Sequence, residues 1–176
     1  LKSFNCNHYW AEMFLTHLRP ARFDDCADIH SAHEYSIRYA CEHYYDDNIL
    51  QAWLERLSMD TYREAIQRRT VWVIEYKNHI QGFFQLNLPK AELDALYVHP
   101  FVHRQGLGTA MLHKAEQIAF NSGLGLLKLY ASLNSMRFYE INGYNKISDC
   151  EVHLNSQVSV PVGLMQKYLY EDHMID

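Results

Sequence analysis

Two glycines, Gly106 and Gly108, lie where the sequence changes from a strand pattern to a helix pattern. At such a turn the first amides of the helix lack backbone partners, and the helix dipole adds partial positive charge. Glycine also lets the main chain approach a ligand closely, so this turn is suited to binding a diphosphate. The same two glycines would equally suit a tight turn without a ligand, so the surrounding sequence has to decide.

Other common phosphate-binding and nucleophile motifs are missing from the sequence. The third glycine of the dinucleotide fingerprint would fall on Met111, and no Gly-Lys-Ser/Thr loop occurs. No Gly-x-Ser-x-Gly elbow occurs either, and Cys150 lies in a segment without a clear pattern. Direct transfer of a group between two bound molecules is therefore favoured over a covalent enzyme intermediate.

The elements that position this turn follow from hydrophobic periodicity. Strands are expected at residues 15–19, 70–76, 80–86, 92–98 and 126–131, with a last pair within 144–169 joined around Asn155-Ser156. Helices are expected after a cap at Asp24 or Asp25, from Asp47, over 60–68, from Leu107 to a stop at Gly123, and over 135–142. Strands and helices alternate along the chain, which predicts an α/β fold.

Strict alternation in the strand 92–98 predicts two faces of different character. One face would carry Glu92, Asp94, Leu96 and Val98, and the other Leu93, Ala95 and Tyr97. The two carboxylates would therefore share a face.

The bulk composition indicates one domain. The 176 residues, 48% of them hydrophobic, are enough for one core and too few for two. We expect residues 1–12 to be an extension, 13–170 the domain and 171–176 a tail. No apolar stretch approaches the ~20 residues of a membrane span, and no leader pattern occurs, so a soluble cytoplasmic protein is expected. The scattered cysteines, Cys6, Cys26, Cys41 and Cys150, indicate reduced thiols.

Acidic residues are concentrated early in the chain. Between Asp24 and Asp60, nine Asp and Glu residues stand against Arg38 and Arg56, a net charge of 2 − 9 = −7. This excess disfavours nucleic acid as a partner and favours a cation. Aromatic residues that could contact a cation lie in the same segment: Tyr35, Tyr39, Tyr44, Tyr45 and Trp53. A solvated helix face with aromatic residues in the core explains the pattern equally well.

Two segments resemble the signatures of the GNAT superfamily of N-acetyltransferases. Residues 103–108 resemble the first, which reads Arg or Gln, two variable residues, Gly, one variable residue, then Gly or Ala. His103 departs from it at the first position. Residues 131–144 resemble the second signature, with Asn134 near a helix start, then Phe138-Tyr139 and a closing Gly143-Tyr144. Arg19-Pro20-Ala21-Arg22 and residues 165–169 extend the resemblance over about 13–169.

The resemblance implies a GNAT fold, with a mixed, mostly antiparallel central sheet of about six to seven strands flanked by helices on both faces. It implies acetyl-CoA as cofactor, with the pantetheine arm in a gap between the strands 92–98 and 126–131. The implied contacts are His103, Arg104, Gln105, Gly106, Leu107, Gly108 and Thr109 at the turn, the backbone of Leu96, Tyr97 and Val98, and the side chains of Asn134 and Phe138.

The resemblance also implies a general acid, Tyr139, that protonates the departing thiolate. An aromatic pair anchoring a short helix would explain Phe138 and Tyr139 as well. An acceptor amine with a pKa of about 10 must lose a proton before it attacks. Asp94 and Glu92 are the candidate bases, with Asp94 preferred, although acids on strands are often merely solvated.

The expected acceptor is a small cationic amine or a peptide. A non-catalytic acyl-CoA-binding or sensing module is the alternative function, and a scaffold that binds no nucleotide is a third. No metal site is expected, because the pairs His30/His33 and His99/His103 have no convincing carboxylate or Cys partner. Neither nucleic acid nor a membrane is an expected partner, and a homodimer is left open.

Overall fold

One mixed sheet forms the centre of the molecule. The computed structural model describes residues 16–102 and 106–170, so the expected extension at 1–12 and tail at 171–176 lie outside the described residues. The sheet has seven strands in the order β1-β2-β3-β4-β5-β7-β6, and only β4 and β5 pair in parallel. The strands are β1 (Thr16–Pro20), β2 (Val71–Tyr76), β3 (His79–Asn87), β4 (Glu92–Val98), β5 (Leu126–Ser132), β6 (Asn145–His153) and β7 (Ser159–Tyr168). This confirms the expected mixed, mostly antiparallel sheet.

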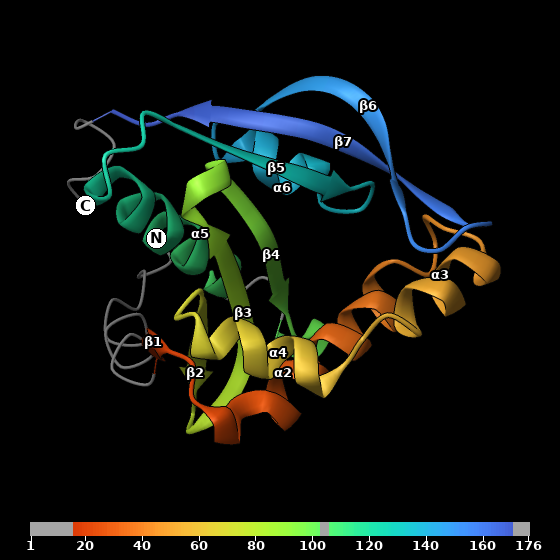
Figure 1. Ribbon diagram of the computed structural model, residues 1–176, viewed down its shortest axis with the longest axis horizontal. Helices are drawn as coiled ribbons and strands as arrows, with labels where there is room; N and C mark the ends of the chain where they lie inside the picture. Colours follow the sequence, from red (N-terminus) through yellow and green to blue (C-terminus); the bar gives the residue numbers. More distant parts are fainter. Residues whose placement is uncertain (1–15, 103–105, 171–176) are drawn as a thin grey trace, which may run out of the picture.

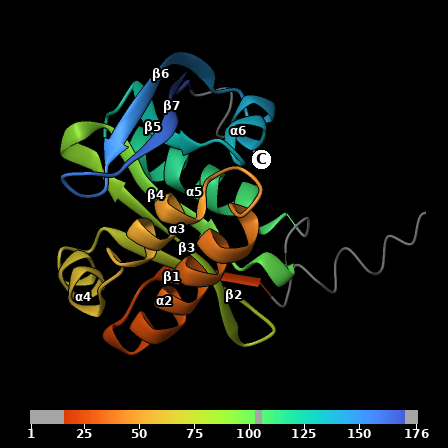
Figure 2. The ribbon, with the colours of Figure 1, turned by 90° about the vertical axis from the view of Figure 1, so that its right-hand side faces the viewer.

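Helices cover both faces of the sheet (Figures 1 and 2). They are α2 (Cys26–Tyr35), α3 (Asp47–Leu54), α4 (Met59–Gln67), α5 (Leu107–Asn121) and α6 (Met136–Ile141). Four short helical turns complete the described elements: η1 (Phe23–Asp25), η2 (Ser36–Ala40), η3 (Leu88–Lys90) and η4 (Pro100–Val102). The predicted elements are confirmed within one or two residues at most ends, as is usual for helix and strand boundaries.

Three apolar clusters hold the layers together. Helix α5 buries Met111, Leu112 and Ala115 against β2 to β5 and β7 on one face, where Tyr139 of α6 joins them. On the other face, α2 and α4 pack against β2 and β3. A third cluster joins η2 and α3 to β7, and Figure 1 shows α3 at the far end of the β6–β7 hairpin.

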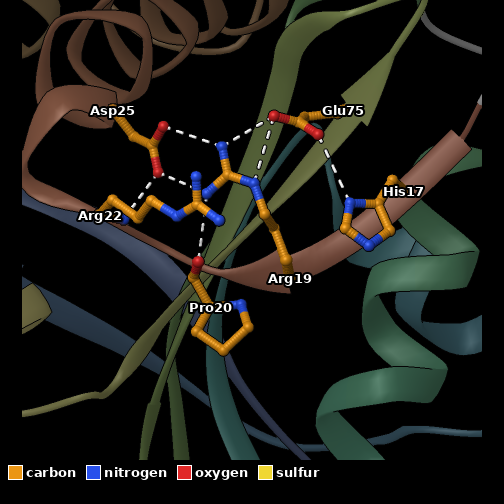
Figure 3. A network of polar contacts seen from close by, with 6 residues as sticks. All are labelled: His17, Arg19, Pro20, Arg22, Asp25 and Glu75. Atoms are coloured by element: carbon orange, nitrogen blue, oxygen red, sulfur yellow. Dashed lines mark hydrogen bonds and ion pairs between the residues drawn. The ribbon is translucent and has the colours of Figure 1, made fainter.

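The start of α2 differs from the sequence prediction. Asp25 occupies the N-cap position, but its side chain makes no capping hydrogen bond to that helix. Its carboxylate instead accepts hydrogen bonds from the Arg19 guanidinium at 2.7 and 3.0 Å and from the Arg22 amide at 2.6 Å. Arg19 also donates to Glu75 of β2 at 2.7 Å, so one arginine joins β1, β2 and η1 (Figure 3).

Arg19 sets the charge state of this network. Burial opposes ionisation of Asp25, but the hydrogen bonds from Arg19 and Arg22 outweigh it and lower the pKa of the carboxyl. The hydrogen bonds from Arg19 likewise lower the pKa of Glu75. A carboxyl group with a lowered pKa in the folded state stabilises the fold at neutral pH, and this contribution disappears as the pH falls through that pKa.

Replacing Arg19 with methionine should therefore destabilise the fold in a pH-dependent way. We expect a loss of about 3 kcal/mol at pH 7, because Asp25 is left buried without its counter-charge. The difference between wild type and Arg19→Met should shrink as the pH falls from 7 toward 3, because protonation of Asp25 and Glu75 removes the ion pairs. Urea unfolding at the two pH values measures it. An equal difference at both would contradict the assigned ion pairing.

None of the helices in the described ranges is long and apolar enough to cross a membrane.

Candidate active site

The sheet opens between β4 and β5. These strands share a single register pair, Glu92 with Lys128, and the Lys128 amide donates to the Ala91 carbonyl at 3.0 Å. Beyond that point the two strands diverge, and Figure 1 shows β4 and β5 running in different directions. The other edge of β4 remains paired with β3 through Leu96, Tyr97 and Val98. Beyond Glu92 this edge of β4 pairs with no described strand, and we call this opening in the sheet the gap; an extended, amide-bearing ligand can pair with such an edge.

A β-bulge in β4 corrects the predicted alternation of faces. The register with β3 shifts between Gln85 and Leu86, opposite Ala95 and Leu93, which leaves Asp94 as the extra residue. Leu93 consequently packs in the α5-side cluster together with Leu96 and Val98, while Ala95 and Tyr97 pack on the α2 side. The predicted grouping was wrong because one inserted residue inverts the pattern on one side of the bulge.

The beginning of α5 presents main-chain donors at the end of the gap. Gly106 has a φ of +78°, a left-handed conformation that suits glycine, and it precedes the first helical residue, Leu107. The N-cap residue, Gly106, offers no side-chain cap, and the first turn of the helix, with Gly108 and Thr109, holds no acid. A Cβ on Gly108 would touch the Phe138 ring at 3.4 Å, so Gly108 lies directly beside that ring. The other turn residues, His103, Arg104 and Gln105, lie outside the described part of the chain.

Tyr139 is held rigidly with its hydroxyl unpaired. Its ring is buried and packs edge-on against Phe138 at 5.0 Å and Tyr144 at 5.6 Å. Its hydroxyl makes no hydrogen bond with any described residue, and burial raises the pKa of Tyr139. The group therefore stays protonated at neutral pH, as a general acid must be.

Asn134 is oriented by a contact that sequence analysis missed. The buried Cys41 thiol, just after η2, donates to Asn134 Oδ1 at 3.4 Å. Nearby, Tyr45 Oη accepts a hydrogen bond from the Leu133 amide at 2.7 Å and donates to the Pro161 carbonyl at 3.0 Å. The contact with Cys41 occupies the Asn134 carbonyl and leaves its amide N–H groups as donors. A partner 93 positions away leaves no local signal in the sequence.

The two candidate bases lie together at the apex of the gap. Glu92 is 3.5 Å from Lys128 Nζ, and Asp94 accepts hydrogen bonds from Gln85 and Asn87 at 3.4 Å. Partial desolvation, followed by repulsion from Glu92, raises the pKa of Asp94. A raised pKa brings a carboxylate closer to the value that a base needs near neutral pH.

The acid-rich segment is largely turned to solvent or paired. Asp24, Asp28, Glu42, Asp46, Asp47, Glu55 and Asp60 are exposed. Asp25 is bound by Arg19, and Glu34 by Arg38 at 2.8 Å. Of the aromatic residues, Tyr45 and Trp53 pack together, whereas Tyr35, Tyr39 and Tyr44 are exposed. The structure thus brings Tyr45 close to the gap but does not gather the acids there.

The described histidines of the pairs His30/His33 and His99/His103 contact residues outside their own pair. His33 Nδ1 is 2.9 Å from Tyr62 Oη, and His30 is 3.7 Å from Glu34. His99 packs against Tyr35 and Phe101, and His103 is not described. Within residues 16–102 and 106–170, no group of three or more His, Cys, Asp or Glu side chains is arranged to hold a metal ion.

Comparison with known proteins agrees with this geometry. The family model for the acetyltransferase (GNAT) family matches residues 9–144. A GCN5-related N-acetyltransferase from Rhodopseudomonas palustris superposes with a TM-score of 0.82 at 24% identity, over 87% of this chain and 95% of that one. PaiA N-acetyltransferase from Thermoplasma acidophilum, in complex with coenzyme A, gives 0.74 at 21% identity, over 87% and 98%. YncA of Salmonella typhimurium, a putative acetyltransferase with acetyl-CoA, gives 0.66 at 19%, over 89% and 95%. No curated protein sequence matches significantly.

The family match and the neighbours with coenzyme A or acetyl-CoA show the class of protein, an acetyl-CoA-dependent transferase. The match over residues 9–144 shows that the chain belongs to the GNAT acetyltransferase family. The expectations of a GNAT fold, an N-acetyltransferase and acetyl-CoA as cofactor are thereby confirmed. The residues present fit that cofactor, because the open edge of β4 ends at the uncapped helix start and at Gly108.

Proposed function

We propose that this protein transfers the acetyl group of acetyl-CoA directly to a primary amine, with Tyr139 as general acid and Asp94 or Glu92 as general base or water relay. The observation that supports the proposal is the opening between β4 and β5 beyond Glu92, beside the start of α5, where Gly108 lies against Phe138, the residue before Tyr139. Acetyl-CoA supplies an activated thioester when bound.

Different residues along the gap would bind the diphosphate, align the pantetheine arm and transfer the protons. The amides of Leu107, Gly108 and Thr109, with the turn 103–106, would bind the diphosphate. The backbone of Leu96, Tyr97 and Val98 and the Asn134 amide would align the arm, with Phe138 packed beside it. Tyr139 would give its proton to the leaving sulfur, while the carboxylates at the bulge would take the proton from the amine, directly or through water.

The acceptor is proposed to be a small cationic amine or a peptide. The net charge of −7 over residues 24–60 supports this proposal, because a negative surface attracts cations to the vicinity even when individual acids are solvated. A homodimer is compatible with the fold but is not needed by the mechanism.

The dependence of kcat/KM on pH tests whether Asp94 or Glu92 is the general base. Asp94→Asn should remove the acidic limb of kcat/KM and lower it by about tenfold or more near neutral pH. Glu92→Gln should instead move that limb to lower pH, because it removes the negative charge that raises the pKa of Asp94. If neither substitution changes the profile of kcat/KM against pH, the carboxylates are not the base.

Thiol release distinguishes an enzyme from a sensing module. Wild-type protein with acetyl-CoA should release thiol in the presence of benzylamine, putrescine or an alanine tripeptide. Thermal stabilisation by CoA reports binding separately. Stabilisation without release for any acceptor would support the sensing alternative.

A further inference from the structure

The Tyr97 side chain is fixed on the face of the sheet opposite Tyr139's helix α6. Its ring lies 4.0 Å from the His33 ring of α2 and is stacked on Phe83 of β3 at 5.6 Å. A phenol clamped between a helix and a neighbouring strand has little rotational freedom. Its hydroxyl therefore has a defined position beside the gap.

The Tyr97 hydroxyl makes no hydrogen bond with any described residue. It is not among the fully enclosed polar atoms that lack a partner, so it is not fully enclosed by protein. Burial of the ring comes first among the causes that raise its pKa, followed by Cys41, Tyr139, Tyr62 and Tyr45. These groups come from the residue just after η2, from α6, from α4 and from the segment before α3. Tyr97 itself lies in the stretch of β4 that pairs with no described strand on the β5 side, and its hydroxyl is close enough to Cys41 and Tyr139 to be affected by their charge.

The surroundings of Tyr97 are unfavourable for a positive charge. The neighbouring His33 has a half-buried ring, and its Nε2 is buried without a partner. Burial, and to a smaller degree repulsion from His30, lowers the pKa of His33 to about 3. Four groups act electrostatically on Tyr97 and are neutral near pH 7, because burial raises their pKa values: the Cys41 thiol and the hydroxyls of Tyr139, Tyr62 and Tyr45.

We propose that the Tyr97 hydroxyl binds the reacting nitrogen of the acceptor, accepting a hydrogen bond from one amine N–H so that the lone pair faces the thioester. This inference rests on the proposed function and adds to it a residue that positions the acceptor. The neutral wall also favours the free amine over the ammonium form at this nitrogen, whatever charge the rest of the acceptor carries.

Tyr97 gains and loses no proton in the reaction. The amine nitrogen forms a bond to the acetyl carbon, and the bond from that carbon to sulfur breaks. The proton of the amine goes to a carboxylate at the bulge, directly or through water, and sulfur takes the proton of Tyr139. Tyr97 only fixes the direction of attack, so its loss should affect acceptor binding more than the chemical step.

Tyr97→Phe tests the inference because it keeps the ring and removes only the hydroxyl. The KM for the best acceptor among benzylamine, putrescine and an alanine tripeptide should rise about tenfold, the effect of one neutral hydrogen bond. The KM for acetyl-CoA and the melting temperature should stay unchanged, since the hydroxyl makes no hydrogen bond within residues 16–102 and 106–170.

Tyr62→Phe is the matched control from the same aromatic group. It removes the hydroxyl bound to His33 and should cost about 1 kcal/mol of stability while leaving the acceptor KM unchanged. An unchanged acceptor KM in Tyr97→Phe, equal changes in both KM values, or a fall in kcat alone would each overturn the inference while the proposed function stands. Absence of thiol release from wild type with all three amines would instead overturn the proposed function.

Discussion

Tyr139→Phe should lower kcat by about 100-fold, the lower end of what a general acid contributes. The substitution removes the only hydroxyl that we assign to protonation of the leaving thiolate. Stability should be unchanged, because the hydroxyl forms no hydrogen bond with the described residues and the ring contacts with Phe138 and Tyr144 remain. Steady-state kinetics with saturating acetyl-CoA, together with thermal unfolding, measure both effects.

The pH profile adds a second test of this acid. Burial raises the pKa of Tyr139, so its protonated form should persist across the working range and wild-type kcat should show no alkaline limb from this group. Tyr144→Phe is the control, since it removes a buried hydroxyl from the ring that packs against Tyr139 at 5.6 Å. It should keep wild-type kcat. If Tyr139→Phe remains within twofold of wild type, the sulfur leaves without help from this residue.

Lys167→Met should destabilise the protein by about 3–5 kcal/mol, the cost of leaving a buried charge without its partner. Lys167 Nζ of β7 donates to both carboxylate oxygens of Glu116, at 3.0 and 2.9 Å. Glu116 is 1% exposed and lies in the middle of α5, the helix whose start forms the proposed diphosphate cradle. Urea unfolding at pH 7 measures the loss.

Two further variants separate the buried charge from the packing of the side chain. The double variant Glu116→Gln with Lys167→Met removes both charges and should recover much of the loss. Arg137→Met breaks an exposed pair with Glu140 at 3.3 Å and should cost less than about 1 kcal/mol. A loss below about 1 kcal/mol in Lys167→Met would show that Glu116 is not held as a buried anion.

Local patterns were sufficient to predict most of the fold. The glycines at 106 and 108, the helix that follows them and the hairpin around Lys77 and Asn78 depend on neighbouring residues, and the structure contains all of them. Both hairpin residues adopt a left-handed φ, 53° and 64°, which suits a two-residue turn between antiparallel strands.

Features that depend on distant partners could not be predicted in this way. The bulge at Asp94 arises from the pairing of β4 with β3 and inverts the expected faces. Asp24 or Asp25 was expected to cap the helix, but the Asp25 carboxylate binds Arg19 instead, a charged partner that a local rule does not consider. Other contacts join elements that are far apart in the sequence: Cys41 with Asn134, and His33 with Tyr62 and Tyr97. The residues that hold Asn134 and Tyr97 in place can therefore be identified only from the structure.

A crystal structure of the protein grown with coenzyme A tests the central claim most directly. We predict density for the diphosphate at the amides of Leu107, Gly108 and Thr109, and for the pantetheine arm between β4 and β5 with its sulfur near the Tyr139 hydroxyl. Coenzyme A bound elsewhere, or a gap closed by protein side chains while the ligand is present at saturating concentration, would contradict it.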